Sequence, residues 1–461
     1  MMFISWLALI GAHAQPYRAP SMRMLDLEAD IGRNEHALVI KLTESSGVSW
    51  QGGQPVGLEP ELAALLSSAR PLFSRSMDVL RADRRTFDPA QQLADLTLYL
   101  QMDTPDAVQR GKQLQAFPQV ECVYLDFLAV PPPADLAPKT PDFSDLQAYT
   151  HAAPDGFGLA EAIHWPGGDG SNVTIADVEY GWEPAHEDLD MAPSMVAWGW
   201  NSGLYDYHGT AVLGQLIAGD NGYGVTGMTP GAEMVVISPY EAENRYNIAA
   251  AIDAAAALLD AGDVLLIEQQ AYAGGNFVPV SISPAVFDVI ALAVAKGIVV
   301  IEPGGNGAQD LDDPYFEGWF DRSIRDSGAI MVGGGASPLS GYRTRDWYPS
   351  GSSYGQRVDV QGWYDNIVTT AGSSMADLFS ASDDLQGYTT YFGGTSGASP
   401  MVAAVAVIAN SIAWEVHGTP WDPWDLRTAM VSTGTPQDNR SGAHIGPQPD
   451  LRRLLWTWGT R

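Results

Sequence analysis

The stretch I-V-V-I-E-P-G-G-N, residues 298–306, decides the fold of this chain, because four apolar residues run straight into polar residues and two glycines. A continuous apolar run of this length is typical of a strand that is buried on both faces. Similar runs recur along the second part of the chain, at V-T-I-A-D (173–177), M-V-V-I (234–237), V-L-L-I (264–267) and I-M-V-G-G (330–334).

Helical patterns stand between these runs, among them Ile248–Leu259, which is almost pure Ala, Ile and Leu, and Pro284–Lys296. Buried strands that alternate with helices predict an α/β fold with a parallel sheet covered on both faces. Ligands of such folds bind beyond the carboxyl ends of the strands. The polar residues that directly follow the apolar runs are therefore the first candidates for a functional site.

The first part of the chain has a different pattern. Strand-like runs at His36–Leu42, Asp95–Met102 and Val120–Phe127 flank a helical pattern at Asp106–Phe117, which predicts a small α+β domain. The proline-rich stretch V-P-P-P-A-D-L-A-P-K-T-P-D, residues 130–142, has the composition of an extended linker.

The N-terminus reads M-M-F-I-S-W-L-A-L-I-G-A-H-A and ends in a small-x-small pattern at Ala12-His13-Ala14. This pattern predicts a signal peptide, although no Lys or Arg precedes the apolar segment. We therefore expect a signal peptide over 1–14, an α+β domain over 15–130, a linker over 131–149 and a larger α/β domain over 150–461.

Charge and cysteine usage exclude several classes of protein. The net charge is −31; residues 1–140 hold 16 acidic and 12 basic side chains (−4), and residues 141–461 hold 39 and 12 (−27). Such a field disfavours nucleic acid and anionic membranes. No apolar run approaches the roughly 20 residues of a membrane span. Cys122 is the single cysteine, so no disulfide within the chain is possible.

Four polar residues stand at the ends of predicted elements. Asp177 ends a strand, His208 opens an apolar helix, Asn306 follows another strand, and Ser396 precedes a helix with Pro near its first turn. A serine becomes a nucleophile when a base removes its proton, and a neutral histidine needs a carboxylate to fix its tautomer. A side-chain amide can hold the developing oxyanion. Taken singly, each residue is more often a helix cap or a turn residue.

Read together and in order, the segments that carry these residues resemble the subtilisin-like serine proteases, the subtilases. The segments are T-I-A-D-V-E-Y-G-W around Asp177, H-G-T-A-V-L-G from His208, P-G-G-N-G around Asn306 and G-T-S-G-A-S-P around Ser396. Weaker matches stand at H-E-D-L (186–189), G-V-T-G-M-T-P (224–230) and S-S-Y-G (352–355). The resemblance covers roughly residues 150–455.

The resemblance implies an Asp177, His208 and Ser396 triad, with Asn306 donating to the oxyanion. It also implies a parallel seven-stranded sheet with helices on both faces, polypeptide substrates, and chemistry that requires no cofactor. The N-terminal domain resembles the inhibitory propeptide of the family, which implies a self-inhibited precursor of a secreted, periplasmic or extracellular endopeptidase. We expect a monomer that binds no nucleic acid and has no membrane span.

The sequence departs from the family after Asp177. The family follows its catalytic aspartate with a small hydroxyl residue and Gly, whereas Val178-Glu179-Tyr180-Gly181 follows here. A second carboxylate two residues from the first can alter the hydrogen bonds that keep Asp177 ionised. The alternative is a subgroup variant in which Glu179 lies in solvent or on a loop cation.

A second departure concerns the substrate pocket. Glu268, Gln269 and Gln270 hold the positions where the family has a Ser-Leu-Gly pattern that lines the primary specificity pocket, and Glu302 stands where a small residue is usual. One hypothesis is a pocket that selects a basic residue by charge pairing. Another is that Glu268 and Glu302 share a proton and shift the active pH downward. A third is that both are hydrogen-bonded to the backbone as the floor of the pocket.

Two further alternatives are open, and a third is excluded. The acidic stretch Q-D-L-D-D-P-Y-F-E (309–317) offers oxygen ligands for a structural calcium ion, or it is a solvated loop. The altered motifs also fit a pseudoprotease or binding protein that has kept the fold. An esterase with a Gly-x-Ser-x-Gly turn is excluded, because Ala398 stands in place of the last glycine.

Overall fold

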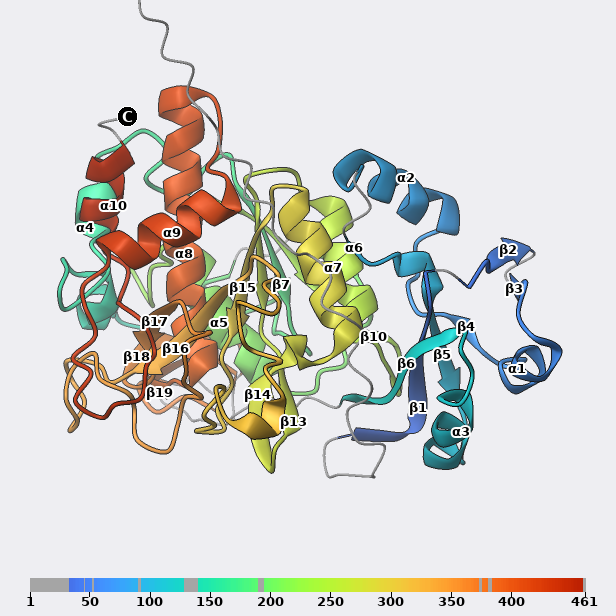
Figure 1. Ribbon diagram of the computed structural model, residues 1–461. Helices are drawn as coiled ribbons and strands as arrows, with labels where there is room; N and C mark the ends of the chain where they lie inside the picture. The colour runs from blue at the N-terminus through green and yellow to red at the C-terminus, as the bar shows by residue number, and fades with distance from the viewer. Residues whose placement is uncertain are drawn as a thin grey trace, which may run out of the picture.

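The computed structural model describes residues 33–44, 46–51, 54–89, 93–127, 140–189, 195–372, 375–379 and 384–458. The predicted signal peptide (1–14) and residues 131–139 of the predicted linker lie outside these ranges. Figure 1 shows two bodies side by side, a small N-terminal domain and a larger α/β domain.

The larger domain is built on a seven-stranded sheet with the order β17-β16-β15-β12-β7-β9-β8, in which every neighbouring pair is parallel. This confirms the predicted parallel sheet. The strands are β7 (Thr174–Val178), β8 (Val196–Trp198), β9 (Glu233–Ile237), β12 (Val264–Ile267), β15 (Val299–Pro303), β16 (Ile330–Gly335) and β17 (Val360–Trp363).

Helices cover both faces of this sheet, as Figure 1 shows. Helices α5 (Asp206–Ile217) and α8 (Thr395–His417) pack on one face, and α6 (Ile248–Leu258) and α7 (Pro284–Ala295) pack on the other. Successive strand residues alternate between the two faces. Ile175 and Leu266 thus join the core with α5 and α8, whereas Ala176 and Leu265 join the core with α6 and α7.

Helix α8 is long and apolar enough to cross a membrane, with a mean hydropathy of 1.5 over its most apolar 18 residues. Every residue of that window is buried in the protein interior. The length and composition of α8 are therefore those of a central core helix, and Ser396 lies in its first turn.

The N-terminal domain has a four-stranded antiparallel sheet with the order β4-β5-β1-β6, covered by short helices, which confirms the predicted α+β domain. The predicted strand at Asp95–Met102 begins later than expected, because Asp95 caps a 3-10 turn over Leu96–Leu98. The elements are β1 (Arg33–Leu42), β4 (Arg70–Pro71), β5 (Tyr99–Asp103), β6 (Val120–Phe127), α1 (Pro60–Leu65), α2 (Met77–Phe87) and α3 (Ala107–Leu114).

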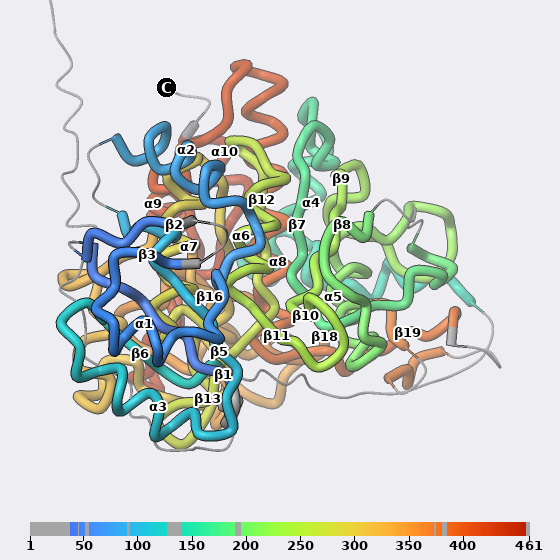
Figure 2. Tube along the Cα trace, turned by 90° about the vertical axis from the view of Figure 1, so that its right-hand side faces the viewer, coloured from blue at the N-terminus to red at the C-terminus, as the bar shows by residue number. Residues whose placement is uncertain are grey.

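This N-terminal sheet packs against α6 and α7, and Figure 2 shows it lying over them. Val39, Tyr99 and Tyr124 of the sheet share one apolar core with α6 and α7. Buried polar contacts cross the same interface: Arg75 donates to both oxygens of Asp253 at 2.7 Å, and Lys41 lies 3.3 Å from Asp288.

Residues 142–149, which fall within the predicted linker, pack as part of the larger domain. The backbone N of Phe143 donates to Gly224 O at 2.6 Å, and two 3-10 turns, Ser144–Leu146 and Ala148–Thr150, come next in the chain. The hydroxyl of Tyr149 is buried and donates to Val368 O at 2.9 Å. The larger domain therefore begins several residues before the predicted boundary at 150.

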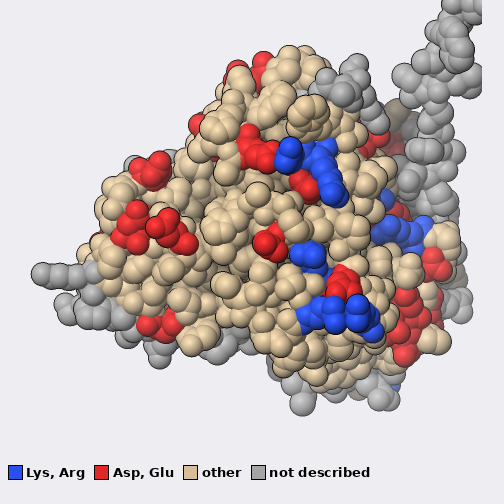
Figure 3. All heavy atoms as spheres, turned by 90° about the vertical axis from the view of Figure 1, so that its left-hand side faces the viewer, with Lys and Arg blue, Asp and Glu red and all other residues tan. Residues whose placement is uncertain are grey.

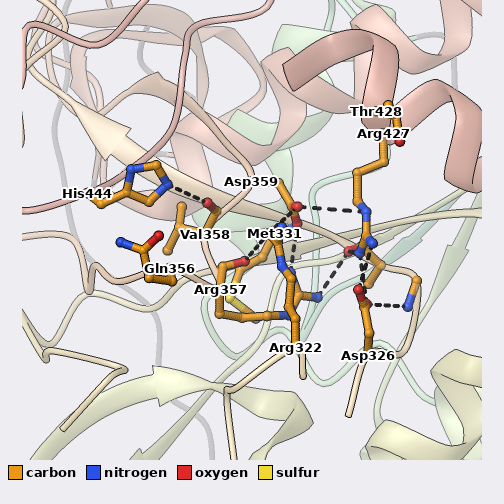
Figure 4. Close-up of polar contacts among 12 residues, drawn as sticks. Arg322, Asp326, Met331, Gln356, Arg357, Val358, Asp359, Arg427, Thr428 and His444 are labelled. Carbon is orange, nitrogen blue, oxygen red and sulfur yellow. Dashed lines mark hydrogen bonds and ion pairs between the residues drawn. The ribbon is translucent and has the colours of Figure 1, made fainter. Parts of the chain in front are cut away.

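A buried ionic network ties the carboxyl-terminal helices to the edge of the sheet (Figure 4). Arg427 of α9 (Pro423–Thr433) donates to both oxygens of Asp326 at 2.8 and 2.6 Å. Asp359, which is fully buried, accepts hydrogen bonds from Arg322, from Arg357 at 2.7 Å and from the backbone of β16. The chain has a single cysteine and so has no internal disulfide; these buried ion pairs connect segments that are distant in the sequence.

The remaining elements lie outside the seven-stranded sheet and the helices that cover it. They are β2 (Ser49–Gln51), β3 (Gln54–Val56), α4 (Leu159–Ala162), β10 (Tyr240–Ala242), β11 (Arg245–Tyr246), β13 (Gln270–Ala273), β14 (Asn276–Pro279), β18 (Ile367–Ala371), β19 (Gly387–Phe392), α10 (Leu451–Trp458) and the 3-10 turns Val280–Ile282, Pro314–Phe316 and Asp384–Gln386.

The view of one face in Figure 3 shows basic side chains lying next to acidic ones, in spite of the strongly negative net charge.

Candidate active site

The predicted site residues lie on elements that meet at the carboxyl edge of the sheet. Asp177 is the fourth residue of β7, and His208 is the third residue of α5. Asn306 follows β15 by three residues, and Ser396 is the second residue of α8. His208 and Ser396 are 1% and 8% exposed, so their reactive atoms lie in an environment largely shielded from water.

Glu179, directly after β7, contacts the His208 imidazole, with Oε1 against Nδ1. Both side chains are fully buried, and the imidazole also packs edge-on against Phe392, with ring centroids 5.5 Å apart. Neither carboxylate oxygen of Asp177 has a hydrogen-bond partner among the described residues. The expectation that Asp177 is the carboxylate on His208 is therefore wrong, and so is the alternative that Glu179 lies in solvent.

A glycine allows this contact to form. A Cβ at Gly209 would lie 2.3 Å from the carbonyl oxygen of Gly181 and 3.1 Å from Cγ of Glu179. Any larger residue would push the start of α5 away from the turn after β7. The Gly after His208 thus lets the imidazole and the Glu179 carboxylate approach one another.

The side chain of Asn306 is held by the first turn of α8. Its Oδ1 accepts from the backbone N of Thr395 at 2.8 Å and from the Thr395 hydroxyl at 3.0 Å, which leaves Nδ2 as the free donor end of the amide. Gln270 fixes the backbone of Asn306 by accepting from its N at 2.8 Å. Gly394 has φ +79°, and a Cβ there would lie 3.0 Å from Nδ2, so this position requires glycine.

Glu268 follows β12 and faces the same side of the sheet as Leu266, two residues earlier, which is the side of α5 and α8. It is 5% exposed, and its carboxyl has no hydrogen-bond partner among the described residues other than the Ser396 hydroxyl, which lies against it. Burial, and then the charges of Glu179 and Asp177, raise the pKa of Glu268 well above its usual value. Burial and Glu179 likewise raise the pKa of Asp177.

Two of the four predicted pocket residues point elsewhere. Gln269 is buried on the opposite face, where its Oε1 accepts from Tyr246 at 3.2 Å. Glu302 is fully buried and accepts from the backbone N of Ser281 at 2.8 Å. It follows Ile301, which belongs to the core with α5 and α8, so Glu302 faces the side of α7. The hypothesis of a proton-sharing Glu268 and Glu302 pair is therefore wrong.

Three donors converge in the site. One ligand atom each from Glu179, His208 and Glu268 lie within 4.8 Å of one another, and all three residues are buried. In the 309–317 stretch, by contrast, Asp312 accepts from Gln356 N at 2.9 Å, and Asp313 caps a 3-10 turn. The possible calcium ion at this stretch stays a prediction.

Chemically, the arrangement combines a serine on a helix start, a buried imidazole fixed by a carboxylate, and an amide donor anchored to the same helix start. Nε2 of His208 has no hydrogen-bond partner among the described residues, so the lone pair that a general base uses is available once Nδ1 carries the proton. The sequence singled out Glu179 as a departure from the family, but its contact with the His208 imidazole was not predicted. The signal for it was Gly181, which stands two residues after Glu179 rather than two after Asp177.

Comparison with known proteins places this chain in a family. The sequence pattern of the subtilase family matches residues 170–446. Subtilisin BL of Lederbergia lenta is 26% identical over 288 residues, which cover 60% of this chain and 88% of that protein. Subtilisin amylosacchariticus of Bacillus subtilis subsp. amylosacchariticus is 26% identical over 298 residues, which cover 62% of this chain and 67% of that protein.

Solved structures agree in fold. Fervidolysin from Fervidobacterium pennivorans, a keratinolytic enzyme related to subtilisin, superposes with a TM-score of 0.57 at 15% identity and covers 96% of this chain, which in turn spans 64% of that protein. The epidermin leader peptide processing serine protease from Staphylococcus aureus gives 0.57 at 14% identity, covering 92% of this chain and 99% of that one. The chain belongs to the subtilase family of serine-type endopeptidases.

Proposed function

We propose that this chain is the self-inhibited precursor of a secreted endopeptidase whose triad is Glu179, His208 and Ser396. The observation that carries the proposal is the contact between Glu179 Oε1 and His208 Nδ1. A carboxylate on Nδ1 fixes the tautomer in which Nε2 is the base, and it stabilises the imidazolium that forms.

In this mechanism His208 Nε2 takes the proton of Ser396 as its Oγ attacks the scissile carbonyl. Asn306 Nδ2 and the backbone N–H of Ser396 hold the oxyanion. His208 then gives its proton to the leaving amine, and a water molecule hydrolyses the acyl-enzyme by the same route. None of these steps requires a metal or an organic cofactor.

The contacts of the N-terminal domain support the precursor role. Its sheet covers α6 and α7 through an apolar core and the Arg75–Asp253 ion pair. Asp126, in its last strand β6, lies close enough to Tyr246 of the larger domain for its charge to help raise the pKa of Tyr246, after burial, and Tyr246 donates to Gln269.

A fluorophosphonate probe tests the enzyme. We expect covalent labelling of Ser396 in the processed wild-type protein and none in Ser396→Ala. Mass-spectrometric mapping of the N-terminus of the secreted protein tests the precursor. A new N-terminus after the N-terminal domain is expected in wild type, and Ser396→Ala should stay unprocessed. Processing that is identical in both would contradict self-cleavage.

The competing function is a pseudoprotease. The observation that favours it is a pair of buried carboxylates: Asp177 has no partner among the described residues, and Glu268 faces the Ser396 hydroxyl, although buried polar groups without full partners destabilise a fold. Absence of label in processed protein between pH 4 and pH 9, with the fold intact by circular dichroism, would support this alternative over the enzyme.

A further inference from the structure

We propose that Glu179, His208 and Glu268 form a binding site for a divalent transition-metal ion of the Zn²⁺ class, and that the ion and the hydrolytic reaction exclude one another. The three residues come from three different elements: the end of β7, the first turn of α5 and the end of β12. Their ligand atoms lie within 4.8 Å of one another.

Buried polar atoms aimed into this cluster lack partners, which is an observation independent of the clustering. Nε2 of His208 has no hydrogen-bond partner among the described residues, the Glu268 carboxyl has none there besides the Ser396 hydroxyl, and both side chains are at least 95% buried. Asp177 adds a third carboxylate, which has no hydrogen-bond partner among the described residues, is fully buried and is close enough for its charge to act on Glu268. Among the described ion pairs, neither Asp177 nor Glu268 has a Lys or Arg partner.

The donor set selects the class of ion. One imidazole nitrogen with two carboxylate oxygens is a ligand set that Zn²⁺ and Co²⁺ accept, whereas Ca²⁺ and Mg²⁺ prefer oxygen ligands throughout. Ligands of a tetrahedral zinc ion lie about 3.4 Å apart, given Zn–N and Zn–O distances of about 2.1 Å. Side-chain movements of about an ångström would bring the three donors to those positions, with water as the fourth ligand.

The ion blocks the base whichever nitrogen it binds. A neutral imidazole has one nitrogen with a lone pair and one that carries a proton. If the ion binds Nε2, it takes the lone pair that receives the Ser396 proton. If it binds Nδ1, the proton moves to Nε2, which then has no lone pair. Inhibition by the ion therefore rests on the proposed function, whereas binding of the ion does not.

Direct binding of Zn²⁺ to the full-length Ser396→Ala chain tests the site without activity as the readout. Isothermal titration at high salt suppresses weak binding to the acidic surface, and Co²⁺ gives a visible absorption band when it is bound by four ligands. We expect one tight site that releases protons on binding. Glu268→Gln in this background should weaken it at least about 100-fold, more than the 10–100-fold that the loss of an outer partner costs.

Glu302→Gln is the matched control, because Glu302 is an equally buried glutamate after the neighbouring strand but faces the other side of the sheet. It should leave the site unchanged. If Glu268→Gln does not fold, as judged by circular dichroism, His208→Asn serves instead and should abolish the cobalt band. Absence of a tight site, or equal binding in the Glu268→Gln or His208→Asn chain, would overturn the proposal.

The two proposals fail separately. Labelling of the metal-free wild-type protein together with no tight zinc site leaves the enzyme and removes the metal site. A tight zinc site in a protein that no fluorophosphonate labels leaves the metal site and removes the enzyme. If both hold, Zn²⁺ should prevent labelling of Ser396 in wild type, and a chelator should restore it.

Discussion

The carboxylate of Glu179 contacts Nδ1 of His208, whereas the carboxylate of Asp177, two residues earlier, has no hydrogen-bond partner among the described residues. Both side chains face α5, because strand side chains alternate between the two faces of a sheet. Two residues along a strand are about 6.6 Å, so a single imidazole cannot meet both carboxylates in the same way. The position of the α5 start therefore selects Glu179.

Glu179→Gln should lower kcat/KM by about 10⁴-fold, because an amide at this position no longer fixes the tautomer in which Nε2 is the base. The measurement is hydrolysis of a fluorogenic peptide by the processed enzyme. Asp177→Asn is the matched control, since it removes a carboxylate from the same strand face without touching the imidazole, and it should cost less than about tenfold. A larger loss of kcat/KM in Asp177→Asn than in Glu179→Gln would show that Asp177, and not Glu179, is the carboxylate of the triad.

Hydrophobic pattern alone predicted the architecture well. The runs at 264–267 and 298–301 form neighbouring parallel strands, with Val264 opposite Val299. They were recognisable because a strand that is covered on both faces consists of apolar residues throughout. The helix after Ser396 and the small N-terminal domain were equally visible, since their apolar periods were long or regular.

The hydrophobic pattern could not predict which carboxylates of the site contact which partners. Asp177 and Glu179 share a strand face, so periodicity could not choose between them, and the choice depends on a tertiary fact, the approach of Gly209 to Gly181. Glu268 and Glu302 each directly follow a core residue of the strand, but Ile267 and Ile301 face opposite sides of the sheet. That difference arises from the register between β12 and β15, which cannot be read from the sequence alone.

Asn306→Ala should reduce kcat by about 10²–10³-fold with little change in KM, because the amide acts on the oxyanion and not on the bound substrate. Gln270→Ala is the comparison variant, because Gln270 accepts a hydrogen bond from the backbone N of Asn306 and acts on the oxyanion only through that residue. It should also lower kcat, but by less than Asn306→Ala does. Stopped-flow kinetics on a peptide ester separates the two constants, and an Asn306→Ala effect confined to KM would contradict the assignment.

Asp326→Asn should make the protein less stable at neutral pH by about 3 kcal/mol, because it breaks a buried ion pair with Arg427. Although burial acts the other way, the Arg427 hydrogen bonds and the charges of Arg357 and Arg427 hold the pKa of Asp326 well below its usual value. A carboxyl with a lowered folded pKa stabilises the fold above its unfolded pKa of about 3.9, and this contribution is lost as the pH falls below that value.

The stability difference between wild type and Asp326→Asn should therefore shrink between pH 4 and pH 2. Urea unfolding of the Ser396→Ala chains at pH 7, 4 and 2.5 measures it without self-digestion. Asp438→Asn is the control, because Asp438 pairs with Arg343 at the surface and its loss should leave no comparable change. A difference that stays constant down to pH 2 would contradict the role of the Asp326 charge.

Arg75→Ala should weaken the hold of the N-terminal domain on α6. Arg75 donates to both oxygens of Asp253, which is 1% exposed, and its loss leaves that carboxylate buried without its partner. Breaking a buried pair costs about 3–5 kcal/mol, which should appear as a lower melting temperature of the unprocessed Ser396→Ala chain. Arg81→Ala is the matched control from the same helix region, because Arg81 lies 4.0 Å from Asp78, an exposed residue, and should change stability by less than about 0.5 kcal/mol.

In the wild-type background, Arg75→Ala should also release active enzyme sooner after processing, measured as a shorter lag in peptide hydrolysis, because the same ion pair holds the inhibitory domain in place. An unchanged lag together with a lowered melting temperature would mean that the domain stabilises the precursor without inhibiting it.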